Sequence, residues 1–183
     1  MKPAPQFSGE RPLEFLQETF TCRFDKEGLI ELISNNPSFF EPTVQISLSN
    51  QQPQAWRATW IVGHCIAKND PRLQPHLATY IDQIRDKEDG YQRELMKIME
   101  KMECDEEHEG KLFDTCLGIC EQVHRTPSVR IVAFRLITKT IKKYPELINE
   151  IEFLLENEYI TDLTPGATHS FQILKEKLMK SIK

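Results

Sequence analysis

The feature that most constrains this chain is a helix-turn-helix joint that recurs along it. Three joints read "ELISNNPSFFEP", "CIAKNDPRLQP" and "TIKKYPELIN". Each passes from an apolar helix end through a polar turn to a proline, namely Pro37, Pro71 and Pro145. Proline suits the first turn of a helix, because the N–H group that it lacks would have no partner there. Recurrence of such a joint predicts stacked helical hairpins.

Apolar residues after the joints recur at spacings of three and four, which place them on one face of a helix. These sets are Phe40, Val44 and Leu48; Leu73, Leu77, Ile81 and Ile84; Leu112, Cys116, Cys120 and Val123; and Leu147, Ile151 and Leu155. The helices before the joints carry an arginine near their start, and apolar residues follow it at similar offsets. The arginines are Arg57, Arg93 and Arg130, separated by 36 and 37 residues, and His169 takes their place in a fifth helix.

The pattern predicts helices and almost no strand. The expected helical spans are 12–21, 25–35, 38–49, 53–68, 74–86, 89–103, 107–124, 128–143, 145–158 and 165–182. The β-branched run at 43–47 is the one rival, and its flanks favour helix.

The period near 37, the paired helices, the "AKNDPRLQPHL" turn and the recurring arginine resemble HEAT repeats. Over roughly residues 25–183 the chain is similar to small bacterial HEAT-like proteins of the armadillo-type superhelix. The resemblance implies an all-α, right-handed α-α superhelix of about four hairpins plus a terminal helix. It implies one domain, 1–183, with an N-terminal cap (1–24), repeats (25–163) and a C-terminal capping helix (164–183). The joint at 103–108 departs from the pattern, since it lacks the proline.

Composition excludes several classes. With 39% hydrophobic and 28% charged residues, the chain of 183 residues is globular rather than disordered. Its net charge of −5 argues against a surface built for nucleic acid. The five cysteines are odd in number and unevenly spaced, so we expect reduced thiols. No membrane-spanning run or secretory signal is visible, and we expect a cytoplasmic protein.

Both tryptophans, Trp56 and Trp60, lie in one predicted helix that is apolar on almost every side. A helix of that kind is usually buried, so we expect both rings in a central core helix. The alternative is that one ring is exposed for stacking on a ligand.

The three repeat arginines, Arg57, Arg93 and Arg130, form what we call the arginine ladder. Each is expected to bind a turn carbonyl or to pair with an acid such as Asp70 or Glu94. The alternative is a row of guanidinium groups that faces an acidic partner.

The Cys and His residues between Cys104 and His124 invite a metal hypothesis, since Cys116, Cys120 and His124 share one helix face. However, Cys116 and Cys120 stand where other repeats carry Leu or Ile, so we expect buried hydrophobic thiols and no metal. The acidic joint at 99–111 is expected to be a solvated turn, with a docking site for a basic partner as the alternative. We find no catalytic motif, expect no enzyme and expect no cofactor.

These observations favour a non-catalytic scaffold or adaptor module, which would bind a protein or peptide partner on the concave face of the solenoid. The candidate binding residues on that face are Gln74, His76, Thr79, Tyr80 and Gln83. The alternative is a DNA-binding protein that resembles the HEAT-like DNA alkylation repair glycosylases. In that case Arg57, Arg93, Arg130, Lys142 and Lys143 would contact phosphates and Trp60 would stack on a base.

Overall fold

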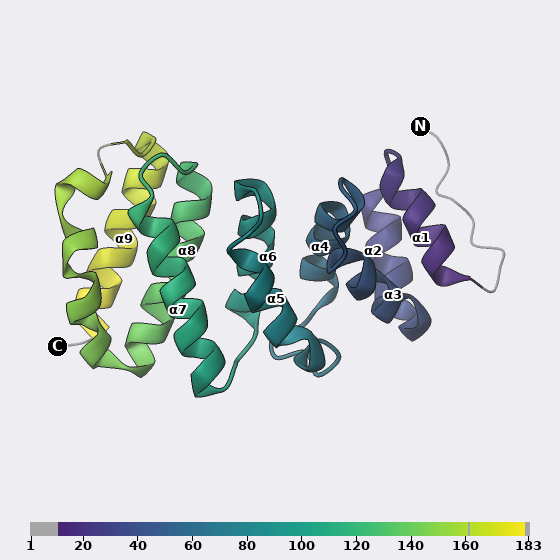
Figure 1. Cartoon of the computed structure of the whole chain (residues 1–183), viewed down its shortest axis with the longest axis horizontal. Helices are drawn as coiled ribbons and strands as arrows, with labels where there is room; N and C mark the ends of the chain where they lie inside the picture. The colour runs from purple at the N-terminus through teal and green to yellow at the C-terminus, as the bar shows by residue number, and fades with distance from the viewer. Residues whose placement is uncertain (1–10, 161, 182–183) are drawn as a thin grey trace. The chain divides into compact units, whose positions relative to one another are not determined.

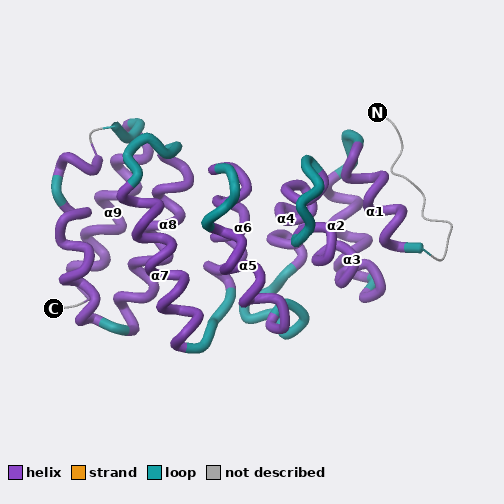
Figure 2. Tube along the Cα trace, in the orientation of Figure 1, coloured by secondary structure: helices purple, strands orange, loops and turns teal. Residues whose placement is uncertain are grey.

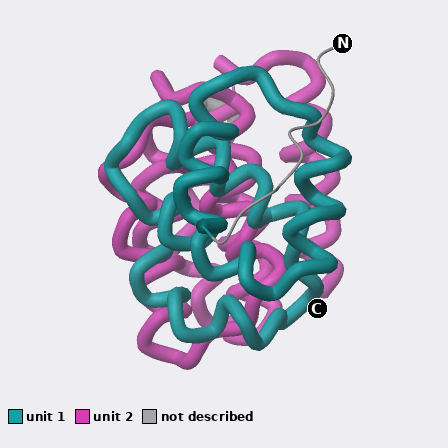
Figure 3. The backbone as a smooth tube through the Cα atoms, turned by 90° about the vertical axis from the view of Figure 1, so that its right-hand side faces the viewer, with its two compact units in different colours: residues 1–80 teal, residues 81–183 magenta. Residues whose placement is uncertain are grey.

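The computed structural model describes residues 11–160 and 162–181, apart from the side chains of residues 157 and 158. Residues 1–10 of the predicted N-terminal cap, and residues 161, 182 and 183, lie outside the described part of the chain. All regular secondary structure in the described residues is helical (Figure 2). The contacts divide the chain into two compact units, residues 1–80 and 81–183 (Figure 3).

The first unit contains four α-helices and the start of a fifth (Figure 1). They are α1 (Pro12–Thr21), α2 (Lys26–Asn35), α3 (Pro37–Ser47), α4 (Gln54–Cys65), the 3₁₀ turn η1 (Gln74–His76) and α5 (Leu77–Ile84), within which the boundary between the units falls. Helix α3 packs against α4, α1 and α2. Its partner-facing residues, among them Phe40 and Val44, are buried as the spacing predicts.

The second unit is organised around one long helix. Its elements are α6 (Asp89–Lys101), α7 (Glu106–Glu121), α8 (Pro127–Lys143), the 3₁₀ segments η2 (Pro145–Leu155) and η3 (Asn157–Ile160), and α9 (Pro165–Ser181). Helix α8 contacts α6, α7, α9 and η2. Phe134 of α8 stacks on Phe171 of α9 with ring centroids 4.2 Å apart. Helix α8 is therefore the core element of this unit.

Two predicted details of the joints are wrong. Pro37 and Pro145 do occupy the first turn of a helix, but Pro71 lies in a turn ahead of η1. That turn is held by the buried Asp70 carboxylate, which accepts hydrogen bonds from the backbone N–H groups of Ala67 (3.2 Å) and Arg72 (3.1 Å). The Asp70 side chain, and not Pro71, therefore fixes the conformation of this joint.

The segment after Pro145 was expected to be an α-helix with Leu147, Ile151 and Leu155 on one face. It is instead a 3₁₀ helix, in which Ile151 and Leu154 are the buried residues. Their separation of three residues matches the three-residue turn of a 3₁₀ helix. The apolar residues at 148, 151 and 154 repeat with this period, and the tighter winding lets them share one face.

The prediction for the tryptophans is also wrong. Helix α4 buries its smaller residues, with Ala55, Ala58 and Val62 all at 0% exposure, while Trp56 is 38% exposed and Trp60 is half-buried. Trp60 lies against the ring of His64, with centroids 4.3 Å apart, and the Lys26 ammonium group is 5.9 Å from its centroid. Small residues allow α4 to approach its neighbours closely, which leaves the large rings on its outer face.

Candidate functional site

The predicted binding residues on η1 and α5 do not form one exposed set. Gln74 and Thr79 are exposed, and Gln83 is half-buried. His76 is half-buried, with Nε2 3.0 Å from the Glu41 carboxylate of α3.

Tyr80 is fully buried, so its assignment as a binding residue is wrong. Its hydroxyl group is hydrogen-bonded to the Ser47 hydroxyl of α3. The spacing of apolar residues in α5 could have predicted this burial, because Tyr80 follows Leu77 by three residues and precedes Ile84 by four. That position falls on the apolar face of α5.

The arginine ladder makes contacts within the protein at all three positions. Arg57 donates from Nη1 to the carbonyl oxygens of Phe20 (2.7 Å) and Cys22 (3.0 Å) at the end of α1. Arg130 is 6% exposed and donates from Nη2 to the Tyr159 carbonyl. Burial lowers the pKa of Arg130. Two ladder positions therefore bind turn carbonyls.

Arg93 differs, because it pairs with the adjacent Glu94 at 2.9 Å and lies in an open groove of the second unit. The groove has a volume of about 510 Å³ and is bounded by α6, α8 and the first turns of α9. We call it the cationic groove. Its charged residues are Arg93, Lys97 and Arg135, its apolar residues are Pro127, Ile131, Val132 and Ala167, and Ser128, Thr164, Gly166 and Ser170 complete it.

Three cations of this groove are partly exposed, and each pairs with an acid that is not among the lining residues of the groove. Glu94 is 6% exposed and meets both Arg93 and Lys97, whose side chains are 33% and 42% exposed. Glu100 is 2.7 Å from Nε of Arg135. Burial raises the pKa of Glu100 despite the opposing attraction of Arg135 and two nearby lysines.

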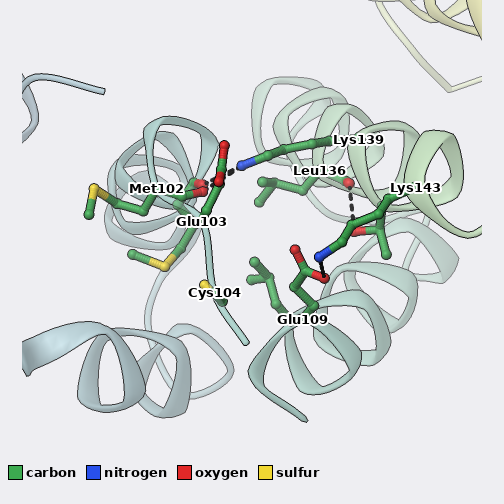
Figure 4. Close-up of a pocket in the computed structure, with 10 residues that line it drawn as sticks. Met102, Glu103, Cys104, Glu109, Leu136, Lys139 and Lys143 are labelled. Atoms are coloured by element: carbon green, nitrogen blue, oxygen red, sulfur yellow. Dashed lines mark hydrogen bonds and ion pairs between the residues drawn. The ribbon is translucent and has the colours of Figure 1, made fainter. Parts of the chain in front are cut away.

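A second pocket, of about 300 Å³, lies among α6, α7 and α8 at the joint that lacks a proline (Figure 4). Lys139 of α8 crosses it and donates from Nζ to the carbonyl oxygens of Met99, Glu100 and Met102 at the end of α6. Asp105 accepts a hydrogen bond of 2.9 Å from the backbone N–H of His108 at the start of α7. These polar contacts stabilise the joint between α6 and α7.

The same pocket includes Cys104, Glu109 and Lys143. Burial raises the pKa of the Cys104 thiol, so the thiol stays protonated near neutral pH. Glu109 accepts from Lys143 (2.7 Å) and from the Tyr144 hydroxyl group (3.0 Å). The charged groups here are thus paired with one another rather than directed at the pocket centre.

The cysteines considered as metal ligands are buried and separate from His124. Burial raises the pKa of Cys120 to about 12, and Cys120 donates to the Arg130 carbonyl, while His124 is exposed. Within residues 11–160 and 162–181, no group of three or more His, Cys, Asp or Glu side chains is placed to hold a metal ion. None of the five cysteines, all of which lie in the described part of the chain, forms a disulfide bond.

Comparison with protein-family models identifies a family for most of the chain. A family model of the HEAT repeat domain matches residues 16–181. The chain belongs to the HEAT-repeat family, which confirms the resemblance and the all-α class of stacked helical pairs. No curated protein and no solved structure gives a significant match. Among the described helices, none is both long and apolar enough to cross a membrane.

Membership of this family indicates a general type of function. HEAT repeats commonly mediate protein–protein interactions, and the family is typically non-catalytic. The groove of the second unit lies on α6, α8 and α9, whereas the sequence directed attention to η1 and α5. The sequence contained a partial signal for the groove, since Arg93 and Lys97 are four residues apart on one helix face. Arg135 joins them only through the packing of α6 on α8.

Proposed function

We propose that this protein is a non-catalytic interaction module that binds a protein partner as a scaffold or adaptor. The observation that carries the proposal is the cationic groove, which combines a half-exposed apolar residue, Ile131, with three solvent-facing cations. An apolar floor with a charged rim is the usual composition of a protein-binding surface. Membership of a family whose repeats commonly bind proteins supports the same conclusion.

The exposed face of η1 and α5, which we call the α5 face, is a second candidate surface for the partner. Gln74 and Thr79 are exposed there, with His76 and Gln83 half-buried beside them in sequence. A partner that contacts this face would meet polar side chains without an adjacent cationic cluster.

DNA binding has less support. Arg130 is buried, and Arg57 is engaged by two carbonyl groups, so two of the five residues assigned to phosphate contacts are not available for them. The net charge of −5 also opposes phosphate binding.

The proposal is tested by site-specific photo-crosslinking in cells that produce the protein. A photoreactive residue replaces Ser128 in the groove, Thr79 on the α5 face, or the exposed Gln172 of α9 as the control. We expect specific protein adducts at Ser128 or Thr79 that are absent at Gln172. The captured protein is then purified and its binding is measured by calorimetry. The absence of a specific adduct at both positions would refute the proposed function.

A further inference from the structure

We propose that the cationic groove binds an acidic segment of the partner protein, with an apolar side chain of that segment against Ile131. The inference rests on the proposed function and adds the chemistry of the partner. It uses charge complementarity, because three cations line the groove, whereas the acids that pair with them, Glu94 and Glu100, are not among its lining residues.

The exposure of the paired groups determines which charge a partner meets. Glu94 is almost entirely covered at 6% exposure, while Lys97 and Arg135 are 42% and 41% exposed. An approaching ligand therefore contacts ammonium and guanidinium groups before it contacts a carboxylate. Arg135 pairs with Glu100 through Nε, and a carboxylate is the acceptor that suits the two terminal Nη groups of a guanidinium group best.

The apolar residues favour a peptide over a nucleic acid. Pro127, Ile131 and Ala167 are half-buried and lie in the same groove as the cations. An aliphatic or aromatic side chain would cover them, whereas a phosphate backbone would leave them in contact with water. The open groove has a volume of about 510 Å³, which is large enough to receive side chains of a peptide.

The overall charge of the protein makes this binding selective. Because the whole chain carries −5, an acidic segment gains no general attraction to the molecule. Binding of such a segment therefore depends on the local cations of the groove, and salt should weaken it.

The chain offers a steric block with a matched control. A Cβ atom added at Gly166, in the groove, would meet nothing within 4 Å, and the same holds for Gly110 on α7, outside it. Gly166→Trp therefore fills the groove without a clash at Cβ, and Gly110→Trp adds the same side chain elsewhere. Circular dichroism and urea unfolding establish that both variants fold.

The test selects binders from a library of short random peptides displayed on phage, using the full-length protein. The expected result is enrichment of peptides rich in Asp and Glu with at least one large apolar residue. Synthetic copies of these peptides, labelled for fluorescence anisotropy, should bind more weakly as salt rises. Their affinity should fall roughly tenfold or more in Gly166→Trp and stay unchanged in Gly110→Trp.

Charge variants test the electrostatic part in both directions. Lys97→Gln should weaken binding about three- to fivefold, while Lys177→Gln, an exposed lysine on α9 outside the groove, should have no effect. Glu100→Gln removes the carboxylate that pairs with Arg135 and should strengthen binding by a similar factor.

Selection of neutral or basic peptides, or of none, would overturn the inference, as would affinities that do not respond to Gly166→Trp. Binding of a single-stranded oligonucleotide that Gly166→Trp abolishes would replace the acidic segment with a nucleic acid. If a partner crosslinks only at Thr79, the proposed interaction function stands, but the cationic groove is not the binding site.

Discussion

At the scale of single residues, Asp70 and Glu100 are two covered carboxylates with opposite effects on stability. Asp70 receives two backbone N–H groups and the guanidinium group of Arg72, whose Nη2 is 2.7 Å away. The hydrogen bond from Arg72 is the largest cause that lowers the pKa of Asp70 to about 2. Burial dominates at Glu100 and raises its pKa. The direction of the pKa shift therefore depends on the hydrogen bonds that the carboxylate accepts and not on its burial alone.

Replacement of Asp70 with Asn should lower the free energy of unfolding by about 2 kcal/mol at pH 7. The contribution of Asp70 is present above its ordinary pKa of 3.8 and is lost as pH falls towards about 2. Urea unfolding at several pH values should therefore show the two proteins converging across that range. Asp82→Asn is the control, because the ion pair of Asp82 with Lys111 is exposed and should contribute little. A variant as stable as the wild type at pH 7 would contradict this account of the turn.

Glu100→Gln should leave the protein as stable or make it more stable at pH 7. Because the pKa of Glu100 is raised in the folded state, its contribution becomes less favourable as pH rises above the ordinary value of 4.5. The advantage of Gln should therefore shrink as pH falls towards that value. Thermal unfolding at pH 4 and pH 7 measures both effects. A clear loss of stability at pH 7 would show that the attraction of Arg135 outweighs the cost of burial.

At the scale of elements, Lys139 connects two helices of the second unit, its own helix α8 and the end of α6. Its Nζ meets carbonyl groups in the last turn of α6, where most carbonyl groups of a helix lack an N–H partner within the helix. The joint between α6 and α7 lacks the recurring proline. The hydrogen bonds from Lys139 of α8 help to fix the end of α6 there.

Lys139→Met should cost about 1–3 kcal/mol, because the last carbonyl groups of α6 lose a charged donor in a partly buried place. The matched control is Lys142→Met on the same helix, where the lysine is exposed. Urea unfolding of both variants gives the comparison. Equal, small effects would mean that water replaces Lys139 at the carbonyl groups.

The helices were predictable from sequence because their apolar spacing and prolines are local signals. The predicted span 89–103 corresponds to α6 (Asp89–Lys101), and 128–143 to α8 (Pro127–Lys143). The exposure of Trp56 was not predictable in this way, since both sides of α4 are apolar and only the packing selects one. The cationic groove also depends on packing, because α8 brings Arg135 beside residues of α6 that precede it by about forty positions.

At the scale of the whole molecule, contacts gather within residues 1–80 and within residues 81–183. Stability in repeat proteins is approximately a sum of local terms and nearest-neighbour terms. A substitution should therefore affect its own unit most strongly.

Hydrogen exchange followed by mass spectrometry tests this expectation. Asp70→Asn should accelerate amide exchange mainly in peptides that precede Tyr80, and Lys139→Met mainly in peptides that follow it. In the wild-type protein, amides of α8 should exchange most slowly within the second unit, because α8 contacts four other elements there. Uniform acceleration along the chain in either variant would indicate one cooperative transition.

The lysine that closes the end of α6 comes from a helix well downstream, so the covalent link between α6 and α7 is not what holds those ends in place. A backbone cut or an inserted tag between residues 103 and 104, ahead of the Asp105 side chain that caps α7, should consequently be tolerated. Two separately produced fragments that meet at this point should reassemble into a working protein, which makes the joint a natural position for a split reporter.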